Sequence, residues 1–535
     1  MVPPRKAGGP PDLRTRVRRA PRGRPVLRIG RRQFLVTALG AAGELAALAG
    51  AGYIGYRLPR SVAAAAATAA RGQVLRFVSR PDLSPPAVTV TRSPAFLSGP
   101  GAAAAPRYIL LSPKGYNTTG PGQPGLMIVD TTGNLVWFRP LPSPASAPFD
   151  LQVQRYHGQP VLTWWAGTVV SVYGEGMGYL ADAAYRTIAT IRAGNGLQVD
   201  LHELNLTPQG TALITAYRTA DADLSALGGP ARGQVLACQA QEIDIASGRM
   251  LFAWDSLDHV PLTESQQPLP SGPNDGPYDY FHMNSVALAP DGDLLISSRN
   301  TWTIYKVSRK GGQIVWRLGG KASDFRRGPG AAFYWQHHVR ALGGGRISIF
   351  DDGASPPEEP QSRGIVLSVD ETSKQARLLA QYTNPARLLA DNQGSVQVMS
   401  DGRVFVGWGD QPYFSEFAAD GTMLLDGRLP ADDQSYRAFT ADWAARPVDQ
   451  PAVAVQSSTA GGVTLYASWN GATELAGWQA LAGPSAETLA IAARARRTGF
   501  ETAIAVNSSG PYFAAVALDA AGRQIGRSTS IRLSA

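Results

Sequence analysis

One pattern of strand-forming segments recurs six times along this chain, roughly every 50–60 residues. Each copy has a strand beside a Gly turn, then an apolar strand, a second turn, and a strand that ends in an aromatic residue or Leu. The clearest copies of the later two strands lie at residues 127–138, 242–254 and 304–316, and weaker copies lie at 179–191, 366–380 and 415–425. Because one small sheet cannot bury its own faces, such repeats must pack against each other.

This repeat predicts a β-propeller, in which small antiparallel sheets pack radially around a channel. We expect residues 86–446 to form six four-stranded blades, with seven blades as the competing count. The chain contains 58 Gly and 40 Pro, yet 44% of its residues are hydrophobic. That composition indicates turns in a folded all-β chain rather than disorder.

The strand pattern changes after residue 446. Residues 447–535 contain short alternating strands and a Trp that we expect to be buried, which is typical of a small β-sandwich of the fibronectin type III or immunoglobulin kind. Cys238 is the only cysteine of the chain, so neither an intramolecular disulfide nor a cysteine metal cluster is expected.

The positive charge of the chain is concentrated at its N-terminus. Residues 1–32 hold eleven Lys and Arg and one acid, and this accounts for the whole net charge of +9. We therefore predict no nucleic-acid partner. Arg31 and Arg32 precede an apolar stretch at 34–56, so residues 1–60 resemble a twin-arginine signal, with 61–85 as a linker.

This N-terminal segment predicts export across the cytoplasmic membrane through the twin-arginine machinery. A stretch of that length is also long enough to span a bilayer, although Glu44 lies near its centre. Cleavage of a signal and retention as a transmembrane anchor therefore both remain open. In either case we expect the rest of the chain outside the cytoplasm, secreted or bound to the membrane.

Three histidines occupy matching places in three consecutive repeats. His202, His282 and His337 each lie on the expected first strand, shortly before its Gly turn, and first strands line the channel of a propeller. Arg299 ends the strand that follows His282, and Asn284 is expected on the same side as His282. The sequence therefore predicts one cavity in which imidazoles, a guanidinium and an amide surround an oxyanion.

The other residues of interest receive structural roles. A single propeller histidine is more often a hydrogen-bonding structural residue than a catalytic one. We expect His259 to be structural or at the rim, and His157 to lie in a surface turn. His338 must point away from His337, because side chains alternate along a strand. A three-histidine metal site is disfavoured by the neighbouring Arg299, and the sequence has no Walker A, dinucleotide-binding or Gly-x-Ser-x-Gly motif. We predict no metal and no cofactor.

Several motifs together resemble the arylsulfotransferases that do not use a nucleotide sulfate donor, in their shorter branch. The matching segments are Asp200–Glu203, Tyr278–Ser285, Arg299, Trp316–Lys321, Gln336–His337, Ser362–Gly364, Ser435–Ala438 and Ser468–Glu474. The resemblance implies an enzyme that transfers a sulfuryl group from an aryl sulfate to a phenol by a ping-pong route.

The resemblance also implies residue roles. The nucleophile, which forms a sulfohistidine, falls on His337, and the residues that hold the sulfate fall on His202, His282, Asn284 and Arg299. His338 stands where this branch commonly has Asp, and the single cysteine cannot make the disulfide found in other members.

The competing hypothesis is a non-catalytic exported propeller that binds an anionic glycan or other polyanion, with the sandwich as an adhesion module. Turnover of an aryl sulfate separates the two. If the enzyme hypothesis holds, His337→Ala should abolish transfer and leave only a small polar void, while replacement of His338 should affect stability more than chemistry.

Overall fold

A computed structural model describes residues 73–98, 107–115, 121–141, 147–270, 276–458, 462–508 and 510–533. The predicted signal or membrane segment at 1–60 lies outside these ranges, as do residues 61–72 of the linker. Within them, no helix has both the length and the apolarity needed to cross a membrane. The prediction of an all-β chain is confirmed, because the described helical segments are all short: α3 (Pro94–Ser98), η2 (Ser225–Leu227), α4 (Ser256–His259) and η3 (Leu262–Glu264).

The described residues between β1 and β26 form six sheets, each with four or five strands. The first has the order β26 (Asp433–Asp442), β2 (Arg107–Gly115), β3 (Gly125–Asp130), β4 (Leu135–Pro140). The second is β5 (Ala147–Tyr156), β6 (Gln159–Val169), β7 (Gly174–Ala181), β8 (Thr187–Ile191). The third is β9 (Leu204–Leu206), β10 (Thr211–Ala222), β11 (Gly233–Asp244), β12 (Met250–Asp255).

The remaining three sheets follow the same plan. The fourth is β13 (Met283–Leu288), β14 (Leu294–Ser298), β15 (Thr303–Val307), β16 (Ile314–Gly319). The fifth is β18 (His337–Gly343), β19 (Arg346–Asp351), β20 (Arg363–Asp370), β21 (Gln375–Tyr382), β17 (Arg326–Arg327). The sixth is β22 (Ser395–Val398), β23 (Val404–Gly407), β24 (Tyr413–Phe417), β25 (Met423–Arg428), β1 (Thr89–Arg92).

Apolar cores join each of these sheets to the next one. Every residue of β14 is buried, as expected for a strand that has a neighbouring sheet on both faces. The sixth sheet also shares a core with the first, so the six sheets close into a ring. Pairs that share a core across successive sheets are Leu110 with Trp164, Trp165 with Ile214, Leu213 with Ile296, Leu295 with Ile349, Phe350 with Val406, and Phe405 with Ile109.

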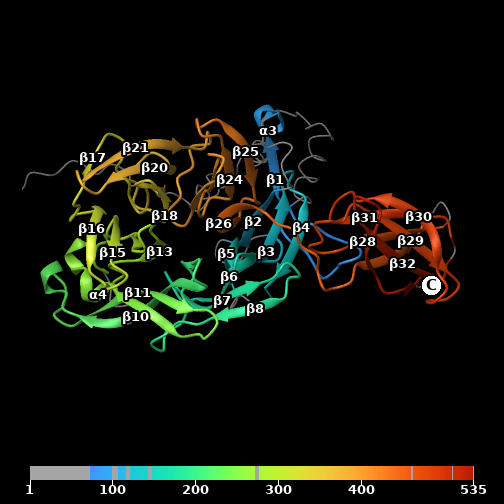
Figure 1. The fold of residues 1–535 in the computed structure, drawn as a ribbon, viewed down its shortest axis with the longest axis horizontal. Coiled ribbons are helices and arrows are strands. Elements are labelled where there is room, and N and C mark those ends of the chain that lie inside the picture. The colour runs from blue at the N-terminus through green and yellow to red at the C-terminus, as the bar shows by residue number, and fades with distance from the viewer. Residues whose placement is uncertain are drawn as a thin grey trace, which may run out of the picture. The chain divides into compact units, whose positions relative to one another are not determined.

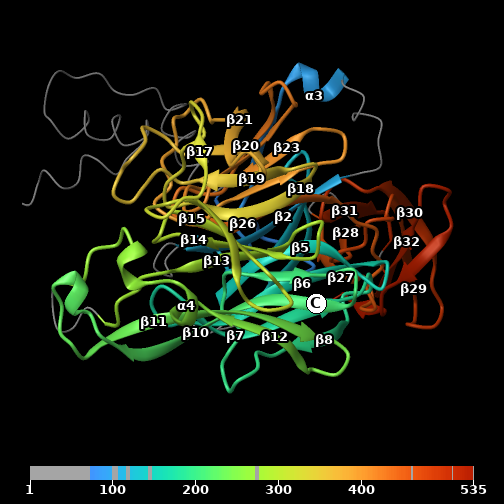
Figure 2. The ribbon, with the colours of Figure 1, turned by 60° about the vertical axis from the view of Figure 1, so that its left-hand side comes forward.

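The ring is closed by a strand from the far end of the repeat region. β26 pairs antiparallel with β2, and this pairing places Phe439 opposite Leu110. The strands at one edge of each sheet lie next to those of the neighbouring sheets: β26 contacts β5, β5 contacts β9, β13 contacts β18, and β22 contacts both β18 and β26. Figures 1 and 2 show β5, β13, β18 and β26 toward the middle of the ring.

The C-terminal residues form two further sheets. One is β27 (Ala452–Ser457), β28 (Val463–Ser468), β31 (Glu501–Val506), and the other is β30 (Ala490–Arg496), β29 (Gly477–Gly483), β32 (Tyr512–Leu518), β33 (Gln524–Arg527), with β34 (Ile531–Arg532) also paired to β32. Leu465, Trp478 and Phe513 belong to a core shared by both sheets. The Asn470 side chain hydrogen-bonds both the N–H and the carbonyl of Phe138 on β4, at 2.9 and 2.8 Å, and so extends that edge strand.

Candidate functional site

A cavity of about 1410 Å³ opens among the loops at one end of the ring. His202, His282, Arg299 and His337 all line it. His202 lies two residues before the edge strand β9, and His282 immediately precedes the edge strand β13. His337 is the first residue of β18. The structure therefore brings together four of the five residues that the sequence placed at the site.

The three imidazole rings lie close to one another. The ring centres of His202 and His282 are 4.8 Å apart, and those of His282 and His337 are 6.3 Å apart. Arg299 follows β14 directly, and its backbone N–H donates to the His282 carbonyl at 3.0 Å. The cluster is thus assembled from three adjacent sheets.

Asn284 is the residue that the structure does not bring to the cavity. His282 has a left-handed backbone with φ of 54°, and the pairing of β13 with β14 is irregular between Met283 and Ser285. The regular alternation that placed Asn284 beside His282 therefore fails. Asn284 is fully buried instead, and its amide donates to the Gln336 carbonyl at 2.7 Å, so it helps to position the residue before His337.

A carboxylate holds Nδ1 of each histidine, and the sequence prediction missed all three. Nδ1 of His202 lies 2.7 Å from Asp200, that of His282 lies 2.6 Å from Asp279, and that of His337 lies 2.9 Å from Asp352. A carboxylate on one ring nitrogen fixes the ring orientation and leaves Nε2 available for chemistry. The short spacings from Asp200 to His202 and from Asp279 to His282 were visible in the sequence. Asp352 directly follows β19, and its only signal in the sequence is its place beside Asp351 at the end of that strand.

Two hydrogen bonds define the tautomer of His337. The backbone N–H of Gln393 donates to Nε2 at 3.3 Å, so Nε2 must be unprotonated. Nδ1 therefore carries the proton and donates it to Asp352. Burial raises the pKa of Asp352, but a protonated Asp352 would force a proton onto Nε2, opposite the Gln393 donor. We accordingly assign the negative charge to Asp352 and a neutral imidazole to His337.

Burial keeps the imidazoles of His282 and His337 neutral. It lowers the pKa of His282, against the opposing effect of Asp279. It lowers the pKa of His337 further, with Arg299 and the other two histidines adding to the effect. A neutral imidazole keeps a free electron pair on Nε2, which is the form required of a nucleophile or a base. His337→Ala would also leave the buried Asp352 carboxylate without its hydrogen-bond partner. The loss of unfolding free energy should therefore be larger than the small polar void expected from the sequence implies.

Arg299 is the cation that lines the cavity beside the three histidines. Burial lowers its pKa, although Asp352 and Asp279 oppose this. Its guanidinium lies over the Trp335 ring at 4.7 Å and donates to the Asn300 side chain and the Asp391 carbonyl at 3.1 and 2.9 Å. Among the described residues it forms no ion pair with a carboxylate, so its charge is available to an anionic ligand.

His338 does not line the cavity. Its ring is buried, its Nδ1 accepts the backbone N–H of Val396 at 3.2 Å, and it contacts the Phe439 ring. Burial and Arg340 lower its pKa well below the usual value. His157 and His259 do not line the cavity either, and Nδ1 of His259 donates to the Asp255 carbonyl at 2.8 Å.

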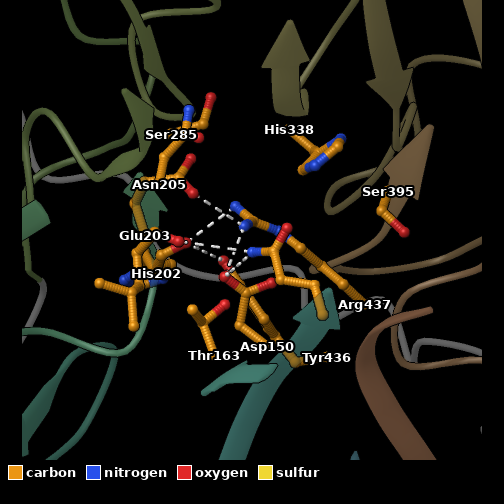
Figure 3. Close-up of polar contacts among 12 residues, drawn as sticks. Asp150, Thr163, His202, Glu203, Asn205, Ser285, His338, Ser395, Tyr436 and Arg437 are labelled. Carbon is orange, nitrogen blue, oxygen red and sulfur yellow. Dashed lines mark hydrogen bonds and ion pairs between the residues drawn. The ribbon is translucent and has the colours of Figure 1, made fainter. Parts of the chain in front are cut away.

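A buried ion network supports the site from β26. Figure 3 shows Arg437 pointing toward Asp150 and Glu203, to which it donates at 3.0 and 3.2 Å. The same guanidinium donates to the backbone carbonyls of His202 and Asn284 at 2.8 and 3.0 Å. Arg437 therefore ties three sheets to the closing strand and fixes the backbone that carries two of the site residues.

The charged groups of the site do not form a metal-ligand set. Among the described residues, no three His, Cys, Asp or Glu side chains have the arrangement that a metal ion requires. The histidines are instead directed by carboxylates on Nδ1 and converge beside a cation. This arrangement suits a tetrahedral oxyanion, with the guanidinium opposite its charge and Nε2 atoms as hydrogen-bonding or nucleophilic groups.

Comparisons with solved structures give only weak likenesses. Matches include a protein of unknown function from Bacteroides caccae, with a TM-score of 0.39, 11% identity, and coverage of 63% of this chain and 99% of that one. Catalytically inactive virginiamycin B lyase from Staphylococcus aureus with quinupristin has a TM-score of 0.33, 9% identity, and coverage of 72% and 96%. The β-propeller domain of Cps50 from Myceliophteria thermophila has a TM-score of 0.29, 11% identity, and coverage of 61% and 94%. We draw no functional argument from scores this low.

The sequence comparison is decisive about the family. No curated protein matches the chain. A model of the arylsulfotransferase (ASST) family matches residues 152–429, which is 278 of the 535 residues and more than half of the chain. The matched span includes all three cavity histidines and Arg299. The resemblance noted in the sequence motifs is thereby confirmed, and the chain belongs to the arylsulfotransferase family.

Proposed function

We propose that this protein transfers a sulfuryl group from an aryl sulfate to a phenol, without a nucleotide donor, through a sulfohistidine on His337. The observation that carries the proposal is the state of this residue: a buried, neutral ring that holds its proton on Nδ1 against Asp352 and turns an unprotonated Nε2 to the cavity. Family membership supports aryl sulfotransfer in general, and the geometry supports His337 as the nucleophile.

In the first half-reaction, the electron pair of His337 Nε2 gives up its hydrogen bond from the Gln393 N–H, which spans 3.3 Å, and attacks the sulfur of the donor. The N–S bond forms while the bond from sulfur to the aryl oxygen breaks, and the phenolate leaves with that electron pair. The ring gains positive charge, which Asp352 stabilises through the proton on Nδ1, as a carboxylate does beside a catalytic histidine. The leaving phenolate takes a proton from Nε2 of His202, which must enter the step as an imidazolium whose charge Asp200 balances at Nδ1.

In the second half-reaction, the same neighbouring histidine removes the proton of the acceptor phenol. The phenol oxygen attacks sulfur, the N–S bond breaks, and His337 recovers its neutral ring. By analogy with phosphoryl transfer, charge accumulates on the three equatorial oxygens of the sulfuryl group. Arg299, the one cation beside the three histidines that has no carboxylate partner among the described residues, would bind that charge.

We also propose the finer organisation of the chain. The closed ring of six sheets is best explained as a six-bladed propeller, and the two C-terminal sheets as a fibronectin type III-like sandwich. Residues 1–60 would act as the twin-arginine signal or anchor that exports the folded enzyme. Fractionation of cells that express the chain with Arg31 and Arg32 both replaced by Lys tests the export: retention in the cytoplasm supports it.

The catalytic proposal is tested with the purified chain, 4-nitrophenyl sulfate and phenol. We expect release of 4-nitrophenolate that depends on phenol, and a sulfuryl group on His337 in a protein quenched before phenol is added. His337→Asn is the key variant, because its amide can still donate to Asp352 but offers no nucleophile. His157→Asn, at an exposed residue outside the cavity, is the control.

Loss of transfer in His337→Asn with full activity in His157→Asn would support the mechanism. Sulfate attached to a different residue would reject His337 as the nucleophile. Failure of the wild-type chain to turn over any aryl sulfate, combined with retention on an anionic glycan column, would favour the binding-module alternative.

A further inference from the structure

A second cation lines the same cavity and takes no part in the mechanism above. Lys114 lies near the end of β2, where it pairs with Gln434 of β26, and both side chains reach the cavity. Its ammonium lies 4.6 Å from the centre of the Phe149 ring. Among the described residues, the Lys114 side chain has neither a hydrogen-bond partner nor an ion pair. The Asp410 carboxylate, which is not in contact with it, raises its pKa and so opposes the effect of burial.

Lys114 and Arg299 lie on opposite walls of this cavity. Lys114 is in the second strand of the first sheet, and Arg299 directly follows the second strand of the fourth sheet. In the closed ring, two sheets separate the first from the fourth in either direction. An anion held by Arg299 therefore leaves Lys114 unoccupied on the far side.

The wall between the two cations suits a flat apolar body. Phe149, Tyr173, Leu201 and Tyr436 line this part of the cavity. Aromatic walls of this kind bind aromatic rings by stacking and edge contacts. The volume of about 1410 Å³ exceeds the roughly 300–1,000 Å³ that is usual for small-molecule sites. A single phenol ring beside Arg299 would fill only part of it.

We propose that the substrates are aryl sulfates and phenols that carry a second anionic group at the far end of the aromatic body, and that Lys114 binds this group. The inference rests on the sulfotransfer proposed above and names the substrate class of that same site. A half-buried ammonium without a counter-ion has lost part of its hydration, and an incoming carboxylate or sulfonate restores a charged partner.

The electrostatics of Lys114 agree with this role. Burial lowers its pKa to about 8, which is the effect expected of a cation that lacks an ion-pair partner. The side chain remains mostly charged at neutral pH. Gln434 beside it accepts a hydrogen bond from the Gln393 side chain at 2.6 Å, and the Gln393 backbone reaches His337, so Lys114 is linked to the reacting centre along the cavity wall.

The test compares two donors of nearly equal shape, 6-carboxy-2-naphthyl sulfate and its uncharged carboxamide counterpart. We expect the wild-type enzyme to favour the carboxylate by about tenfold in kcat/KM, the effect of about 1.4 kcal/mol from one charge-assisted contact. In Lys114→Met the ratio should fall to about one. Lys310→Met, which removes an exposed lysine outside the cavity, should keep the wild-type ratio.

A ratio near one in the wild type, or an unchanged ratio in Lys114→Met, would overturn the proposal. A binding measurement separates this failure from failure of the sulfotransfer itself. By calorimetry, 6-hydroxy-2-naphthoate should bind the wild-type protein about tenfold more tightly than 6-hydroxy-2-naphthamide does, and Lys114→Met should abolish that difference even if no sulfate is transferred. A difference that persists in Lys114→Met but vanishes in Arg299→Met would show that Arg299 binds the carboxylate, and would reject Lys114.

Discussion

Replacement of Asp352 by Asn tests whether this carboxylate fixes the tautomer of His337. The two side chains have nearly the same shape, so the change alters the hydrogen bond at Nδ1 more than the packing. An Asn amide can donate to Nδ1, and the ring proton then moves to Nε2. In that tautomer Nε2 has no free electron pair, and its proton faces the backbone N–H of Gln393. We expect a folded protein with a strongly impaired nucleophile.

The size of the loss follows from the contacts that the active tautomer gives up. A hydrogen bond to a charged group contributes about 1.5–3 kcal/mol, so loss of the bond to Asp352 amounts to roughly 3 kcal/mol. The bond from Gln393 favours the active tautomer in both proteins, so its energy is not added. At about 1.4 kcal/mol per factor of ten, sulfation of His337 should slow about a hundredfold.

The assay is a single turnover of 4-nitrophenyl sulfate, followed by the absorbance of the released 4-nitrophenolate. Glu242→Gln is the control, because Glu242 is a buried carboxylate paired with Arg309 that does not line the cavity. It should lower the melting temperature without slowing the burst. A burst in Asp352→Asn within tenfold of the wild-type rate would refute the assignment of the tautomer, because the ring would then not depend on its carboxylate.

Four further predictions concern activity at low pH, stability at low pH, Arg299 and His338. Because burial holds the pKa of His337 well below its usual value of about 6.5, kcat/KM for the donor should stay level as pH falls through that value; a decline centred at or above it would contradict the neutral buried ring. The folded protein should lose stability as pH falls below about 6.5 in denaturant titrations, since His337 and His338 take up protons more readily once unfolded. Arg299→Lys should lower kcat/KM for the donor about a hundredfold, or about 2.7 kcal/mol, because Lys cannot both lie flat on Trp335 and present a fork of donors; near-normal kinetics would mean that any cation suffices. His338→Ala should cost about 1–3 kcal/mol of unfolding free energy by orphaning the Val396 N–H, with little change in kcat, and the reverse pattern would exchange the roles of the two adjacent histidines.

The fold class and the histidine cluster were accessible from the sequence because both depend on a regular repeat. Strand and turn residues return at similar intervals, so equivalent positions in the copies come to equivalent places in space. His202, His282 and His337 could be aligned in this way without knowledge of any contact between sheets. The family resemblance rested on the same segments, and it extended to Arg299.

The parts that the sequence did not yield depend on irregular backbone or on contacts between distant segments. The prediction for Asn284 was wrong because the left-handed backbone of His282 breaks the alternation of side chains along the strand. The local sequence pattern does not predict a positive φ at this histidine. Asp352 was not predicted because it follows β19, the next strand of the sheet, and is 15 residues from His337 in the sequence. Lys114 was missed because it lies far along the chain from the three histidines and Arg299, in a sheet that carries no histidine at the site.

The pairing of β26 with β2 has a consequence for the order in which a newly made chain becomes active. A ribosome delivers the strands of five sheets, and three strands of the first, before it delivers residues 433–442. Until then Asp150 and Glu203 have no Arg437 between them, and the carbonyls of His202 and Asn284 lack their shared donor. Pairing across such a long stretch of chain is slow, because loop closure must precede any gain in contacts. The nascent protein would thus assemble its catalytic centre last, when the ring closes, and a chain stopped short of that strand would hold all three histidines without the support that aligns them.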